Sequence, residues 1–218
     1  MDYGRYPLPR SLTSSAFVAT AGEKLDFYFN YVTSDGGTYQ DYGWARLLNA
    51  GDSSQAAVLF TARTKPSGSI IPGADLPNPD ATLTPSNVPI TTEPGYRPPD
   101  PNIPGDSGIG PVWSPLGPNP PNGFNGTCWD VGCGYTGWVQ ASFIIASSGN
   151  YKLQFGVINW DDPLWDSGMA FDGATIAGVS IDDDTRLAPI PEPETYAMLL
   201  AGLGLMGVLA RRRKQKAA

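Results

Sequence analysis

The 218-residue chain contains no histidine, two cysteines, and charged side chains at 16% of its positions. Soluble domains usually have about 25% charged residues. The absence of histidine removes the usual general base at neutral pH, the histidine-dependent nucleophile triads and the histidine-containing zinc sites. Carboxylates, aromatic rings and amides remain available. We therefore expect a binding or structural protein and not an enzyme.

Positive charge is scarce before residue 211. That part contains nine Lys/Arg and 21 Asp/Glu, a net charge of −12, whereas the last eight residues contain five cations and no acid. An acidic body repels phosphate backbones. The sequence therefore predicts no nucleic-acid partner.

Glycine and proline are abundant, with 26 and 22 copies, and both interrupt regular structure. Short segments of alternating apolar and polar residues predict strands. They span residues 15–21, 24–33, 42–49, 56–63, 138–146, 150–159, 169–176 and 178–187. Ser148-Gly149-Asn150 predicts a hairpin turn. The expected fold is all-β, an antiparallel jelly-roll-like β-sandwich.

Residues 66–121, which we call the Pro-rich segment, hold 16 of the 22 prolines. Proline cannot donate to a strand ladder, so we expect no ladder strands here but an extended, polyproline-like loop. A long surface insertion that is partly disordered is the favoured interpretation. A linker between two domains is the alternative.

The C-terminal end has three parts in a fixed order. Pro191-Glu192-Pro193 is followed by a charge-free stretch at 196–210 and by a basic tail at 211–216. As a helix the charge-free stretch would be about 22 Å long, somewhat short of a hydrocarbon core of about 30 Å. It predicts a single C-terminal transmembrane helix whose basic end stays in the cytoplasm.

This order resembles the PEP-CTERM sorting signal of Gram-negative bacteria that make exopolysaccharide, here over residues 189–218. The resemblance implies export, transient anchoring in the inner membrane, and cleavage by an exosortase. The mature protein would lie at the cell surface or in the extracellular biofilm matrix, with exopolysaccharide as a further partner. Recognition falls to Pro191, Glu192 and Pro193. By the same resemblance, the membrane anchor includes Tyr196, Ala201, Gly202, Leu203, Gly204, Leu205 and Ala210. The positive charges that stop transfer across the membrane are Arg211, Arg212, Arg213 and Lys214.

The preceding residues, 1–188, are expected to form one exported domain. The start of the chain shows no apolar signal peptide, so we expect the domain to be incomplete at its N-terminus by a strand or two. Segments 29–36, 41–44, 132–138, 155–160 and 166–173 resemble secreted β-sandwich proteins whose activity is not established. That resemblance implies a fold and a location, and no activity.

Cys128 and Cys133 predict a disulfide, because paired cysteines in an exported protein oxidise. Closing so short a loop removes little chain entropy, so its expected role is local shape. Without histidine, two cysteines cannot complete a tetrahedral zinc site.

Acidic residues cluster near strand ends. Asp161, Asp162 and Asp166 offer oxygen ligands for a structural calcium ion, and 182–184 form a second acidic run. The alternative is that these residues cap strands and solvate turns. An Asp/Glu pair could also serve a secreted glycoside hydrolase, which is the rival to the non-enzymatic hypothesis.

The chain contains six tryptophans. Aromatic rings exposed in loops can stack on sugar faces, and Trp129 and Trp165 are the candidates for glycan contact. Packing in the core or between sheets is the alternative for any one of them.

Overall fold

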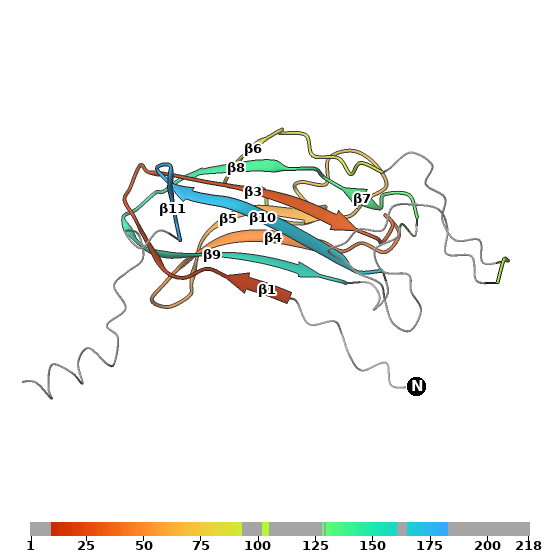
Figure 1. Cartoon of the computed structure of the whole chain (residues 1–218), viewed down its shortest axis with the longest axis horizontal. Helices are drawn as coiled ribbons and strands as arrows, with labels where there is room; N and C mark the ends of the chain where they lie inside the picture. Colours follow the sequence, from red (N-terminus) through yellow and green to blue (C-terminus); the bar gives the residue numbers. More distant parts are fainter. Residues whose placement is uncertain (1–9, 93–101, 105–127, 129, 161–164, 183–218) are drawn as a thin grey trace, which may run out of the picture.

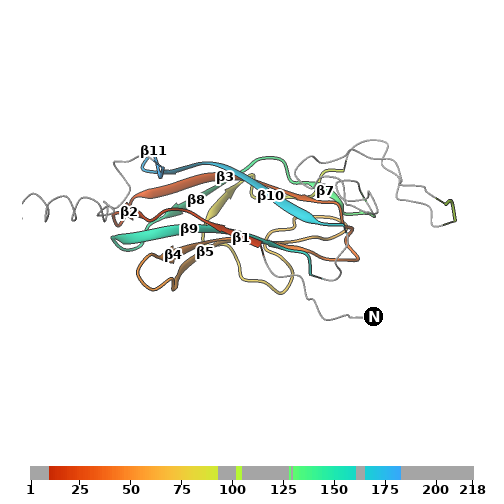
Figure 2. The same ribbon diagram turned by 60° about the horizontal axis from the view of Figure 1, so that its bottom comes forward.

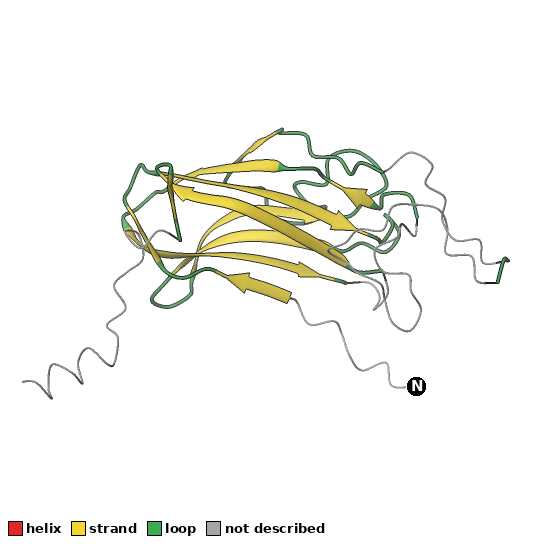
Figure 3. Cartoon of the chain, in the orientation of Figure 1, coloured by secondary structure: helices red, strands yellow, loops and turns green. Residues whose placement is uncertain are grey.

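The computed structural model describes residues 10–92, 102–104, 128, 130–160 and 165–182. These residues form strands and loops without a helix (Figure 3). The strands lie in two layers, as the two views of the ribbon show (Figures 1 and 2). The predicted all-β sandwich is thereby confirmed.

The first layer, sheet A, has five strands, which pair antiparallel. Its order is β1 (Arg10–Thr13), β9 (Gly149–Ile158), β4 (Tyr42–Asn49) and β5 (Gln55–Arg63), and β2 (Phe17–Ala19) also pairs with β9. Strands β1 and β2 pair with different parts of β9. The N-terminal strands therefore share one edge of the sheet.

The second layer, sheet B, has six strands, also antiparallel. Its order is β11 (Val179–Ser180), β10 (Ser167–Ile176), β3 (Lys24–Thr33), β8 (Val139–Ile144) and β6 (Thr82–Thr84), and β7 (Gly134–Tyr135) pairs with β3. This strand order and that of sheet A do not confirm the jelly-roll connectivity. The predicted transmembrane helix at 196–210 lies outside the described residues.

Strand β3 shows why these segments are strands. Its apolar side chains at every second position, from Leu25 to Tyr31, are fully buried, while Lys24 and Tyr28 are exposed. Successive side chains of a strand point to opposite faces. One face of β3 therefore faces the space between the sheets, and the other faces solvent.

Phenylalanine rings from both sheets meet in that space. Phe29 of sheet B stacks on Phe60 of sheet A at 3.9 Å between ring centroids. Phe27 makes an edge-to-face contact with Phe155 at 5.3 Å. Such pairs add about 0.5–1.5 kcal/mol to the gain from burial. The aromatic cluster thus holds the two layers together.

The predicted hairpin at Ser148-Gly149-Asn150 is wrong. Strand β8 belongs to sheet B and β9 to sheet A, so the chain crosses between layers here. The backbone N–H of Ala21 donates to Ser148 Oγ at 3.0 Å, which fastens the crossing to the loop after β2. Alternation shows that one face of each strand is buried, but not which strand lies beside it.

The prediction for the Pro-rich segment needs correction in its first half, residues 66–92. Strand β6 pairs with β8, although no ladder strand was expected here. Ile70, Leu83 and Val88 are buried in the core. These apolar residues sit between the prolines and supply enough buried surface to order the chain. Residues 93–101 and 105–121 lie outside the described residues.

Candidate functional site: an aromatic groove on sheet A

A hollow of about 470 Å³ lies on the solvent-facing side of sheet A. We call it the aromatic groove. It is lined by residues of three adjacent strands and the segments beside them: Tyr42, Gly43, Trp44, Thr61, Leu76, Ile158 and Trp160. Its volume falls in the range of sites that accept small ligands, about 300–1,000 Å³.

Alternation along β4 places the groove residues. Gly43 and Ala45 are buried and face the core, whereas Tyr42, Trp44 and Arg46 are half-buried and face outward. Directly paired residues of antiparallel strands share a face. Tyr42 pairs with Ile158 and Trp44 with Gly156, so β9 contributes to the same surface.

Gly156 makes room for Trp44. A Cβ atom at Gly156 would lie 2.0 Å from Cζ2 of Trp44. The six-membered ring of the indole therefore occupies the space above the glycine. A side chain at this position would push the indole away from the sheet, so the shape of the groove depends on this pair.

Trp160 and Tyr42 form an aromatic pair in the lining of the groove. Trp160 follows β9, is 53% exposed, and meets Tyr42 edge to face at 5.7 Å between centroids. The guanidinium of Arg63 lies over the Tyr42 ring, with Cζ 4.7 Å from the centroid. Cation–π contacts of this kind hold the cation beside the ring. The groove thus presents one strongly exposed indole next to a fixed positive charge.

A buried carboxylate anchors Trp160 from behind. Asp41 is fully buried; its Oδ1 accepts the main-chain N–H of Trp160 at 3.0 Å and its Oδ2 accepts the Ser167 hydroxyl at 2.5 Å. The Tyr31 hydroxyl, within hydrogen-bonding distance of Thr64 Oγ1 at 2.9 Å, belongs to the same cluster. Burial raises the pKa of Tyr31, and the nearby Asp41 charge raises it further. Tyr31 therefore stays protonated and serves as a structural hydrogen-bonding group.

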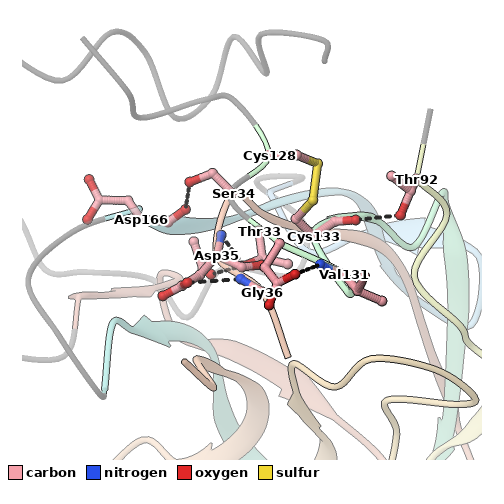
Figure 4. The surroundings of a disulfide bond; sticks show 11 residues. Thr33, Ser34, Asp35, Gly36, Thr92, Cys128, Val131, Cys133 and Asp166 are labelled. Atoms are coloured by element: carbon pink, nitrogen blue, oxygen red, sulfur yellow. Dashed lines mark hydrogen bonds between the residues drawn. A yellow bond between two sulfur atoms is a disulfide. The ribbon is translucent and has the colours of Figure 1, made fainter. Parts of the chain in front are cut away.

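The second cysteine of the disulfide directly precedes β7, and Figure 4 shows the residues around the bond. Cys128 and Cys133 are bonded, with a Cα–Cα distance of 5.4 Å, and both are buried. The bond confirms the predicted pairing. The Gly37 N–H donates to the Val131 carbonyl at 2.7 Å, and the Thr92 hydroxyl donates to the Cys133 carbonyl at 2.8 Å. The short loop therefore positions the β3–β4 connection, in agreement with a role in local shape.

The predicted calcium ligands are only partly described. Asp161 and Asp162 lie outside the described residues. The main-chain carbonyl of Asp166 accepts the Ser34 hydroxyl at 2.7 Å (Figure 4), and its Oδ1 accepts the Asn159 side-chain N–H at 3.3 Å. The described residues contain no group of three His, Cys, Asp or Glu side chains placed to hold a metal. Calcium binding stays a prediction.

The tryptophans that line the groove, Trp44 and Trp160, are not the two predicted to contact glycan. Trp129 lies outside the described residues, and Trp165 is 6% exposed, which leaves little of its ring available for stacking. Trp44 and Trp160 line the groove instead. Alternation along 42–49 could have placed Trp44 on an outer face, but its contact with Gly156 depends on strand pairing that the sequence does not reveal.

Residues 189–214 match the PEP-CTERM protein-sorting motif. The match contains the predicted recognition residues Pro191–Pro193 and the basic stop at 211–214, and the motif marks an exported protein of the cell envelope. No curated protein and no solved structure matches the chain.

Within the described residues, the structure has no helix with the length and apolar character of a membrane span.

Proposed function

We propose that the protein is an exported cell-surface or exopolysaccharide-matrix protein whose C-terminal tail is cleaved by an exosortase in the inner membrane of a Gram-negative bacterium. The PEP-CTERM match at residues 189–214 supports the sorting step. The Pro-Glu-Pro motif at 191–193 is the recognition element, residues 196–210 anchor the precursor, and the cations at 211–214 keep its end in the cytoplasm.

Intact-mass analysis tests the sorting step. The full-length gene product is expressed in cells with and without exosortase, and the exported protein is weighed. We expect loss of the tail, and release from the inner membrane, in the exosortase-containing cells alone. An unchanged mass and location in both strains would refute the proposal.

The exported domain binds polysaccharide through the aromatic groove. The observation that supports this role is the combination of Trp44, Trp160 and Tyr42 around a hollow of about 470 Å³. The faces of aromatic rings carry partial negative charge, and the C–H bonds on one side of a sugar ring carry partial positive charge. Sugar rings therefore stack on such surfaces without needing a catalytic group.

A pull-down on the extracellular polysaccharide of the producing cells tests this role. Trp160→Ala should lose retention, whereas Trp138→Ala should keep it. Trp138 is a matched control because it is 54% exposed but precedes β8 of the other sheet. Release of shortened sugars that a single carboxylate substitution abolishes would indicate a glycoside hydrolase instead. Absence of retention in the wild type would indicate a purely structural protein.

A further inference from the structure

The outer face of sheet A is basic, although the protein is acidic. The outward positions of β4, β5 and β9 include Arg46, Arg63 and Lys152, as the alternation and the strand pairing show. No Asp or Glu occurs within these three strands. Before residue 211 the chain carries 21 acidic residues against nine basic ones. Three cations on strands that contain no acid are therefore a local reversal of charge.

The outer face of sheet B, in contrast, carries acidic side chains beside its lysine. Lys24 there lies 2.8 Å from the Asp26 carboxylate and is neutralised by it. Asp172, which pairs with Tyr28 on the neighbouring strand, adds a further negative charge to that face. The charge reversal therefore belongs to the side of the sandwich that carries the aromatic groove.

The two arginines lie on either side of the groove aromatics. Arg63 pairs with Tyr42 across the strands, and Arg46 lies two residues beyond Trp44 on the same face, about 7 Å along β4. The Nε of Arg46 donates to Gln154 Oε1 at 2.7 Å. This neutral partner holds the guanidinium in place without cancelling its charge.

Neither arginine is firmly paired with an acid among the described residues. Arg46 takes part in neither of the two ion pairs found there. Arg63 approaches the Asp75 carboxylate at 4.0 Å, but the Asp75 side chain is 98% exposed. Exposed pairs of this kind contribute at most about 1 kcal/mol. A carboxylate on a ligand could therefore compete for both guanidinium groups.

We propose that the aromatic groove binds an acidic polysaccharide, with sugar rings stacked on Trp44 and Trp160 and sugar carboxylates facing Arg46 and Arg63. The inference rests on the proposed role of the groove in polysaccharide binding and adds the charge class of the ligand. The groove fits the chemistry of a uronic-acid polymer, whose apolar sugar faces match the aromatic rings and whose regularly spaced carboxylates match the flanking cations.

The test measures how tightly the full-length protein binds two polymers that have the same backbone and differ in charge. Polygalacturonic acid and its carboxyl-reduced form are titrated in low salt, and dissociation constants are measured by calorimetry. We expect the acidic polymer to bind at least about tenfold more tightly than the reduced one. Added salt should weaken the acidic complex and reduce this difference.

Variants distinguish stacking from charge. Trp160→Ala should weaken binding of the acidic polymer by about tenfold, as for an aromatic hot spot. Arg46→Gln should weaken it by about fivefold in low salt and have no effect on the carboxyl-reduced polymer. Trp138→Ala should bind like the wild type, and thermal melting confirms that each variant is folded.

The outcomes separate the two proposals. Equal affinity for both polymers, lowered by Trp160→Ala, would overturn the acidic preference and leave polysaccharide binding intact. Absence of binding to either polymer would overturn the inference and count against the proposed function. Retention of an acidic peptide, poly-glutamate, with an affinity equal to that of polygalacturonic acid would also overturn it, since charge alone would then explain the binding.

Discussion

At the scale of single residues, Asp41 is the side chain on which the end of the sandwich depends. It precedes β4 of sheet A, and its carboxylate accepts hydrogen bonds from Ser167, the first residue of β10 in sheet B, and from the Trp160 backbone. The same carboxylate thus joins the two layers and holds one wall of the groove. Because Asp41 is fully buried, water does not readily take over as hydrogen-bond acceptor when this side chain is removed.

Replacing Asp41 by alanine should lower the free energy of unfolding by about 2–4 kcal/mol, because the Ser167 hydroxyl and the Trp160 N–H lose their acceptor. Guanidinium chloride denaturation followed by tryptophan fluorescence measures the change. Asp41→Asn, which keeps one acceptor oxygen, is the control and should lose less. An alanine variant within about 0.5 kcal/mol of the wild type would contradict the role given to this carboxylate.

Asp26 gives a prediction about pH. Burial tends to raise its pKa, but hydrogen bonds from Lys24, Ser142 and Gln140 together outweigh burial, so the pKa lies below its ordinary value of 3.8. A lowered pKa in the folded state stabilises the protein above the unfolded pKa, and this contribution is lost as the pH falls through the folded value. Asp26→Asn should therefore reduce the melting temperature at pH 6 by more than at pH 3. A difference that stays constant between these pH values would contradict it.

The tryptophans of the groove also show that residue type alone does not predict which side chains are exposed. Six tryptophans are visible in the chain, and their type alone indicates stacking or packing. Trp165 proves buried and Trp160 exposed, although both lie next to acidic or loop residues. Exposure depends on which loop folds over which ring. That information lies in contacts between segments far apart in the chain, such as Trp160 with Asp41.

At the scale of elements, strands with strong alternation were predictable and their neighbours were not. Strands β3 and β4 begin and end where the pattern predicts, at 24–33 and 42–49. The alternation arises from burial of one face, which acts on each strand separately. Strand β6 was missed because three residues among prolines give no periodic signal. The crossing between β8 and β9 was missed because pairing depends on the whole core.

The disulfide loop is the element whose removal gives a local prediction. Replacing both Cys128 and Cys133 by serine should lower the free energy of unfolding by about 2 kcal/mol, the value expected for so short a loop. The larger effect should be local, because the loop accepts hydrogen bonds from Gly37 and Thr92. Hydrogen exchange should rise at the amides of the β3–β4 connection.

Strand β9, which lies between β1 and β4 in sheet A, serves as the internal control for that experiment. Its amides should keep their protection in the serine variant. Uniform loss of protection across both sheets would show that the disulfide supports the whole fold and not one connection. Reduction of the wild-type protein should reproduce the pattern of the variant.

At the scale of the whole molecule, charge divides the chain into unlike parts. The sandwich is acidic apart from the outer face of sheet A, and the cations at 211–216 lie within or next to the PEP-CTERM match. Net charge influences solubility and association more than fold. An acidic exported body with one basic face would remain soluble among anionic polymers and still contact them through that face.

Processing should therefore change the charge of the molecule in a defined direction. Cleavage on the C-terminal side of Pro193 removes Glu194 and five Lys/Arg, which changes the net charge from −7 to −11. Isoelectric focusing should place the protein from exosortase-containing cells at a lower pH than the protein from cells without the enzyme. A variant with both Pro191→Ala and Pro193→Ala should stay at the precursor position in both strains, because the recognition element is lost. Wild-type bands at one position in both strains, or a double variant that still shifts, would contradict cleavage at this motif.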